Sequence, residues 1–345
     1  MEAVFIALFF FFTVVGFSTY YLQKGIGTMA DPMRQFGLFL LNKAPAGIVD
    51  LFNDEKGNGA KTWMNLGMIW LTLAGIGTFL SLWHDYDPRA LDSLASIGWA
   101  YDDGSALATF VNATLITGLF SILLGGGLIA VARSGAGKMA SESNASLTAL
   151  LFSVLTAAAL LLPTILGLLA DLSAENETLL QDLFMHSLRA FIIIAVMINV
   201  LLTVAQRKGE TIQASNWFVF MALASFIFGS QFRFFGELAG STQVVWLGER
   251  MTQSWVMISL FFAVAYHLVP RAASRPIWSD SMTKASMLLL FFTLPPFMMS
   301  SADAGTLLEN LGAILMTLAL LPIFAGSVNI IMTAAGNATG VVARP

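Results

Sequence analysis

Four charged residues, Arg233, Glu237, Glu249 and Arg250, lie close together in the sequence, around the short connection between two apolar stretches. An ionisable group near the hydrocarbon of a bilayer is costly unless an opposite charge accompanies it, so such groups point to a functional site. We predict a buried ion-pair cluster in which Glu249 faces the interior of a helix bundle and pairs with Arg233 or Arg250. The alternative is an interfacial salt bridge that contributes only to packing.

Residues that ligate metals are scarce in this chain. It has 3 histidines, His84, His186 and His267, and no cysteine. The absence of cysteine excludes disulfides, thiolate zinc sites, iron–sulfur clusters and c-type haem attachment. His84, with Asp85 and Asp87 after it, could bind a divalent cation. The alternative for all three histidines is a solvated or interfacial side chain.

The segments that must position these residues are apolar. Of the 345 residues, 57% are hydrophobic and 11% are charged, and the mean hydropathy is +0.77. About 20 apolar residues span a bilayer as a helix, because each backbone polar group must be bonded within its own segment. We therefore predict an all-α, polytopic membrane helix bundle of about nine transmembrane helices. They cover roughly residues 3–22, 63–83, 105–132, 146–170, 183–205, 214–233, 245–268, 281–300 and 306–334.

The distribution of charge predicts the orientation of the chain. All but four of the 17 lysines and arginines follow the first, third, fifth, seventh or ninth of these segments. The exceptions are Arg89, Arg189, Arg233 and Arg250, and the loops on that other side are acidic. Basic residues stay on the cytoplasmic side of a membrane. We predict an N-terminus outside the cell and a cytoplasmic C-terminus.

Four stretches, in order along the chain, resemble the catalytic subunit I of cbb3-type cytochrome c oxidases, in the haem-copper oxidase superfamily. They are 90–124, "LLTVAQRKGETIQASNWFVF" (201–220), "VVWLGERMTQSWVMISLFFAVAYHLVPRAASRPIW" (244–278) and "LGAILMTLALLPIFAGSVNIIMTAAG" (311–336). The resemblance implies two parts. Residues 1–62 form an extra N-terminal anchor with a basic loop, and residues 63–345 form eight helices like the first two arcs of that subunit, without its last four core helices.

The positions at which this family places its histidine ligands are occupied here by other residues. The resemblance aligns Phe110 with a haem-ligand position, Glu249 with a copper-ligand position, and Ser300 and Ser301 with an adjacent histidine pair. The family uses six histidines, and this chain has 3. Haem b and copper, the cofactors of the family, are therefore not expected in the isolated chain.

These observations lead to a leading hypothesis and two alternatives. The first is a structural, assembly or regulatory subunit of a respiratory complex in a bacterial or archaeal cytoplasmic membrane. Its partners would be other membrane subunits, docked where the missing helices leave an open side, and lipid, with no nucleic acid. One alternative is half of a split oxidase or nitric oxide reductase-like complex whose partner supplies the haem ligands. The other is an ion or small-solute carrier gated by Glu249 and Arg233.

Overall fold

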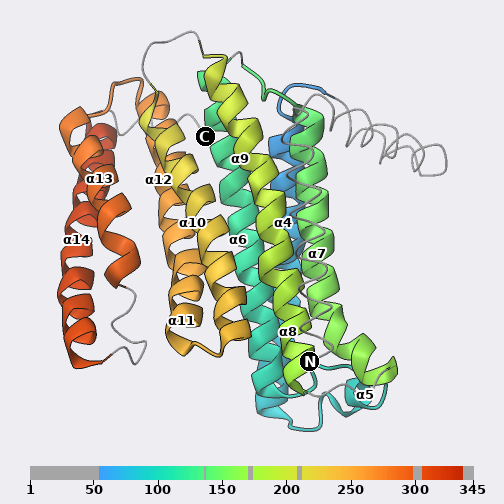
Figure 1. Cartoon of the computed structure of the whole chain (residues 1–345). Helices are drawn as coiled ribbons and strands as arrows, with labels where there is room; N and C mark the ends of the chain where they lie inside the picture. Colours follow the sequence, from blue (N-terminus) through green and yellow to red (C-terminus); the bar gives the residue numbers. More distant parts are fainter. Residues whose placement is uncertain (1–53, 136, 170–173, 208–211, 298–304, 337–345) are drawn as a thin grey trace. The chain divides into compact units, whose positions relative to one another are not determined.

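The computed structural model describes residues 54–135, 137–169, 174–207, 212–297 and 305–336 (Figure 1). Over these residues the chain forms helices joined by turns and contains no strand. Seven helices are long and apolar enough to cross a membrane. The chain is thus a polytopic helical membrane protein, as its composition predicts. The first predicted span, 3–22, and most of the predicted N-terminal part lie outside the described residues.

The described helices follow one another along the chain with short connections. They are α4 (Asn58–Tyr86), α5 (Asp92–Ala95), α6 (Gly104–Ser134), α7 (Glu142–Leu169), α8 (Ala174–Asp182), η2 (Leu183–Leu188), α9 (Arg189–Ala205), α10 (Ala214–Ala239), α11 (Thr242–Arg250), η3 (Met251–Trp255), α12 (Val256–Ala273), α13 (Asp280–Phe297) and α14 (Thr306–Ala335).

Two of the spans are composite helices. The stretch Thr178–Ala205 joins the end of α8, η2 and α9, and Thr242–Ala273 joins α11, η3 and α12. Each contains one π-helical turn, a feature that often occurs at functional sites. Of the segment predicted at 281–300, residues 281–297 are described and lie in α13, which is not among the seven candidate spans. Its first turns carry two charged residues, Asp280 and Lys284.

The helices belong to two compact units, a division within residues 63–345 that the sequence does not predict. The first unit contains the described residues up to Gly125 together with Ser141–Val196. The second contains Gly126–Ala140 and the described residues from Met197 onward. Both α6 and α9 contribute residues to each unit.

In the first unit, small residues let α4 and α6 approach closely. A Cβ atom added at Gly67 would lie 2.9 Å from the carbonyl oxygen of Gly118, and one at Gly118 would lie 3.0 Å from that of Gly67. Such contacts are typical of membrane helices, where packing rather than water exclusion drives association. Trp63, Phe120 and Phe152 fill the adjacent space, with ring centroids 5.2–6.0 Å apart.

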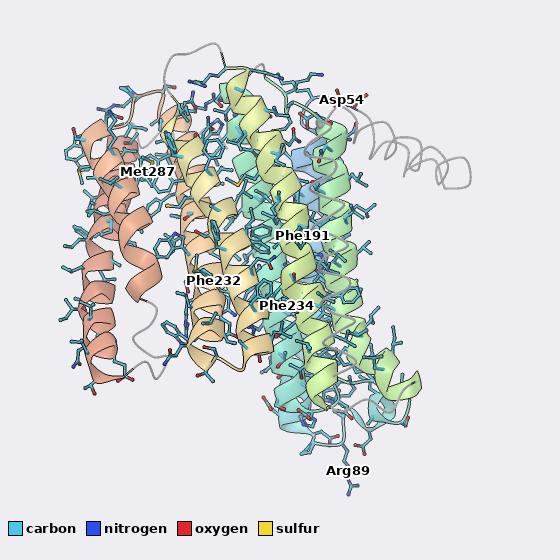
Figure 2. The ribbon with its side chains drawn as sticks, viewed as in Figure 1. Asp54, Arg89, Phe191, Phe232, Phe234 and Met287 are labelled. Atoms are coloured by element: carbon cyan, nitrogen blue, oxygen red, sulfur yellow. The ribbon has the colours of Figure 1, made fainter. Side chains whose placement is uncertain are left out.

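The two ends of this unit are polar and chemically distinct, with Asp54 at one and Arg89 at the other (Figure 2). At the Arg89 end, Asp103 precedes α6 and accepts hydrogen bonds from the Ser105 hydroxyl (2.6 Å) and from the backbone N–H groups of Ser105 and Ala106. The hydroxyl contributes most to lowering the pKa of Asp103 below its usual 3.8, followed by the backbone groups. Asp103 is therefore an ionised N-terminal cap of α6.

In the second unit, aromatic stacking and one buried amide hold the helices together. The rings of Phe218 on α10 and Tyr266 on α12 stack 5.5 Å apart. Asn329 of α14 is fully buried, and its Nδ2 donates to the Ser279 carbonyl and the Thr283 hydroxyl, both at 2.8 Å. These bonds fix α14 against the start of α13, beside which it lies in Figure 1.

Candidate functional site

The predicted ion-pair cluster lies in the second unit, at the hairpin between α10 and α11. Gly240 ends α10 in the left-handed conformation, with φ 66°. The N–H of Ser241 donates to the carbonyl of Gly236 over 2.8 Å, which closes the last turn of α10. The chain then reverses into α11, which packs back along α10. This reversal brings residues near 249 alongside those near 233.

Glycines on both helices set how closely α10 and α11 approach. A Cβ atom added at Gly248 would meet the backbone N and Cα of Arg233 and would lie 2.5 Å from the carbonyl oxygen of Gly229. A Cβ at Gly236 would lie 2.6 Å from the backbone N of Val245. The two backbones are therefore in direct contact. Glu249, the next residue after Gly248, is placed beside the Arg233 side chain.

Arg233 forms ion pairs with two glutamates. Its Nη1 contacts Oε1 of Glu249, and its Nη2 lies 3.2 Å from Oε1 of Glu237, one turn further along α10. The Arg233 side chain is 17% exposed, whereas those of Glu237 and Glu249 are 34% and 38% exposed. The cluster is thus half-buried, with the cation on the inner side and both carboxylates toward the outside.

Arg250 does not belong to this group of three. It is exposed, and its guanidinium lies over the Trp246 ring, 5.4 Å from the centroid. Consecutive residues of a helix point about 100° apart, as the 3.6-residue repeat requires, so Glu249 and Arg250 cannot both face Arg233. Of the four residues of the predicted buried cluster, Arg233, Glu237 and Glu249 form a half-buried group, and Arg250 lies outside it.

A double-mutant cycle that removes the charges of Arg233 and Glu249 one at a time and then together should give a coupling free energy of about 1 kcal/mol. The pair is partly sheltered, so its coupling should exceed that of a fully exposed pair. Arg233→Gln, Glu249→Gln and the double variant can be compared by reversible unfolding in mixed detergent micelles. Asp280 and Lys284, 2.6 Å apart and more than 70% exposed, are the matched control. Equal coupling in the two pairs would contradict the expectation.

Two of the positions that the resemblance aligns with metal ligands, Phe110 and Glu249, hold groups unsuited to haem iron or copper. Phe110 packs its ring against Tyr101, with centroids 5.1 Å apart, and offers no donor atom. Glu249 is engaged by Arg233, so a metal cation there would have to displace a guanidinium of like charge. Ser300 and Ser301 lie outside the described residues. The side chains of Phe110 and Glu249 therefore do not fit haem iron or copper.

The three histidines are held by separate local contacts. His84 is half-buried near the start of α6. His186, in the π-helical turn η2, lies 3.5 Å from Oδ1 of Asp182. His267 is buried near the end of α12, with its Nε2 3.3 Å from Nη1 of Arg133. Within the part of the chain that the structure describes, no three acidic or imidazole side chains gather as a metal-ligand set.

Arg189 is a functional candidate that no motif in the sequence singles out. It is 5% exposed and lies within a membrane-spanning helix, at the first turn of α9 after η2. Its guanidinium sits over the Phe152 ring, 4.0 Å from the centroid, and Nη2 lies 3.5 Å from the Thr117 hydroxyl. The sequence feature that could have identified Arg189 is its position directly before the apolar run "AFIIIAVMI". A charge at that depth is a functional-site hypothesis by default.

No family model matches the sequence, and no curated protein matches it.

Proposed function

We propose that this chain is a non-catalytic membrane subunit, related in its helical frame to subunit I of the cbb3-type oxidases, that stabilises or helps to assemble a respiratory complex. One observation carries the proposal. Glu249 stands where the resemblance aligns a copper-binding histidine, and it is in an ion pair with Arg233. A position that needs a neutral imidazole for copper instead contains a carboxylate already matched by a cation.

The Arg233 pairing supports a structural use of this position. A lone glutamate near the hydrocarbon would be costly, and Arg233 offsets that cost. The close contact between α10 and α11 at Gly248 leaves the pair little freedom to separate. The helices that would carry a metal ligand in an oxidase would therefore carry a salt bridge in this chain. The salt bridge would stabilise the α10–α11 hairpin and would not take part in a reaction.

The outer surface of α14 supports a role in assembly. Leu307 is 81% exposed and Phe324 is 69% exposed, and several leucines and isoleucines between them are also exposed. We propose that lipid or another membrane subunit covers α14 in the assembled complex.

The proposal is tested by purifying the tagged full-length chain from native membranes under mild detergent. The expected result is co-purification of other membrane subunits, together with a reduced-minus-oxidised spectrum of the separated chain that shows no b-type haem. Stoichiometric haem in the separated chain would overturn the proposal. Haem that stays only with a histidine-rich partner would replace it with the split-oxidase alternative.

A further inference from the structure

Two arginines and a histidine gather at one end of the second unit, away from the Arg233 cluster. Arg133 lies in the last turn of α6, and His267 and Arg271 lie near the end of α12. Nε2 of His267 is 3.3 Å from Nη1 of Arg133. A guanidinium can only donate hydrogen bonds, so this nitrogen accepts and His267 is the neutral tautomer protonated on Nδ1. His267 is 4% exposed and thus holds Arg133 in place without cancelling its charge.

Arg271 adds a second cation to the same place. It follows His267 by one helical turn, so the two side chains share a face of α12, and it interacts electrostatically with both His267 and Arg133. Both arginines are exposed. Among the described residues, neither forms an ion pair with a carboxylate, in contrast to Arg233 and Lys284.

The start of α10 adds further positive potential. Asn216, in the first turn of α10, donates from Nδ2 to the Ser134 hydroxyl over 2.7 Å, so this helix N-terminus lies beside Arg133. A helix N-terminus carries a partial positive charge. Each arginine also lies near the partial negative charge at the C-terminus of its own helix. The two full positive charges of the arginines exceed these partial negative charges, so the group has a net positive charge that favours an anion.

An apolar stripe leads away from this group along α12. Leu268 precedes Arg271 by three residues and is 50% exposed, and Phe261 lies two turns before Leu268 and is 57% exposed. Residues 261, 268 and 271 therefore follow one face of the helix. A ligand that fits this face has an anionic head at the two arginines and a hydrocarbon chain along Phe261 and Leu268.

We propose that Arg133 and Arg271, oriented by His267, bind the phosphate of an anionic lipid headgroup. A guanidinium donates two parallel hydrogen bonds to phosphate oxygens, and basic sites between membrane helices on the cytoplasmic side bind such headgroups. This end of the unit is the one that the charge distribution predicts to face the cytoplasm. The proposal is independent of any relation to oxidases.

The test uses the delipidated full-length chain in neutral phosphatidylcholine nanodiscs, with phosphatidylglycerol added in steps and retained lipid counted by native mass spectrometry. Each arginine near a membrane surface contributes about fivefold to the affinity for anionic lipid, so Arg133→Gln with Arg271→Gln should weaken retention about 25-fold. Arg250→Gln, which removes an exposed arginine beyond the other end of α12, is the control and should leave retention unchanged. Retention that is equal in the double variant and in the wild type would overturn the proposal.

Two further measurements distinguish a lipid from a soluble phosphate and a loss of binding from a loss of folding. Inorganic phosphate that displaces the lipid only at a large excess supports a lipid source, and phosphate that binds equally well alone supports the same phosphate site with a soluble ligand. Arg133→Lys with Arg271→Lys keeps both charges and is expected to fold even if the glutamine variant does not. It should retain lipid several-fold less well than wild type, because an ammonium lacks the bidentate fork. Unaltered lipid retention in the lysine variant would contradict the claim that paired hydrogen bonds from each guanidinium hold the phosphate.

Discussion

Replacing Glu142 with alanine is expected to lower the free energy of unfolding by about 3 kcal/mol. Glu142 begins α7, is fully buried, and accepts hydrogen bonds at 3.0 Å from the backbone N–H groups of Gly57 and Gly59 at the start of α4. The first N–H groups of a helix have no partner within the helix. Alanine would leave the N–H of Gly59 buried without an acceptor. Reversible unfolding in mixed detergent micelles measures the loss.

The capping at Glu142 is reciprocal, so loss of one cap is expected to weaken the other. The backbone N–H of Glu142 donates to Oδ1 of Asp54 over 2.9 Å, so each of two chain segments caps the helix of the other. Glu142→Gln keeps one acceptor oxygen and should cost about half as much as alanine.

Asp280→Ala is the matched control for Glu142. Asp280 also lies in the first turn of its helix, but its side chain is 74% exposed and paired with Lys284. Its removal should change the stability by about 0.5 kcal/mol at most. Equal losses at Glu142 and Asp280 would show that the buried cap contributes no more than an exposed charge.

Seven of the nine spans expected from the sequence are found among the described residues, and Arg233 was one of the two partners expected for Glu249. Apolar length and opposite charge can be read from short segments of sequence. The cap at Glu142 could not. In the sequence, "SESNAS" is a polar start of a helix, and nothing there indicates that its carboxylate reaches a glycine 83 residues away. Arg233 and Arg250 remained alternative partners of Glu249 in the sequence, since the face that α11 turns toward α10 depends on how the two helices pack. The two π-helical turns also depend on tertiary packing, and apolar periodicity does not reveal them.

Replacing Gly248 with alanine is expected to destabilise the chain by about 3 kcal/mol or more. The added methyl group would meet the backbone of Arg233 and Gly229. A flexible side chain could move aside, but a helix backbone can do so only if the whole helix shifts. α10 and α11 would have to separate, which would also pull Glu249 away from Arg233. Reversible unfolding in mixed detergent micelles measures the effect.

Gly75→Ala provides the control for helix propensity, because Gly75 is exposed within α4 and a Cβ there meets nothing within 4 Å. It should raise the stability by up to about 1 kcal/mol. Repeating Gly248→Ala in the Arg233→Gln, Glu249→Gln background separates steric from electrostatic effects. If backbone contact sets the loss, most of it persists without the charges. If the loss disappears with them, the glycine acts only by positioning Glu249, and the hairpin is held together by its ion pair rather than by the fit of two backbones.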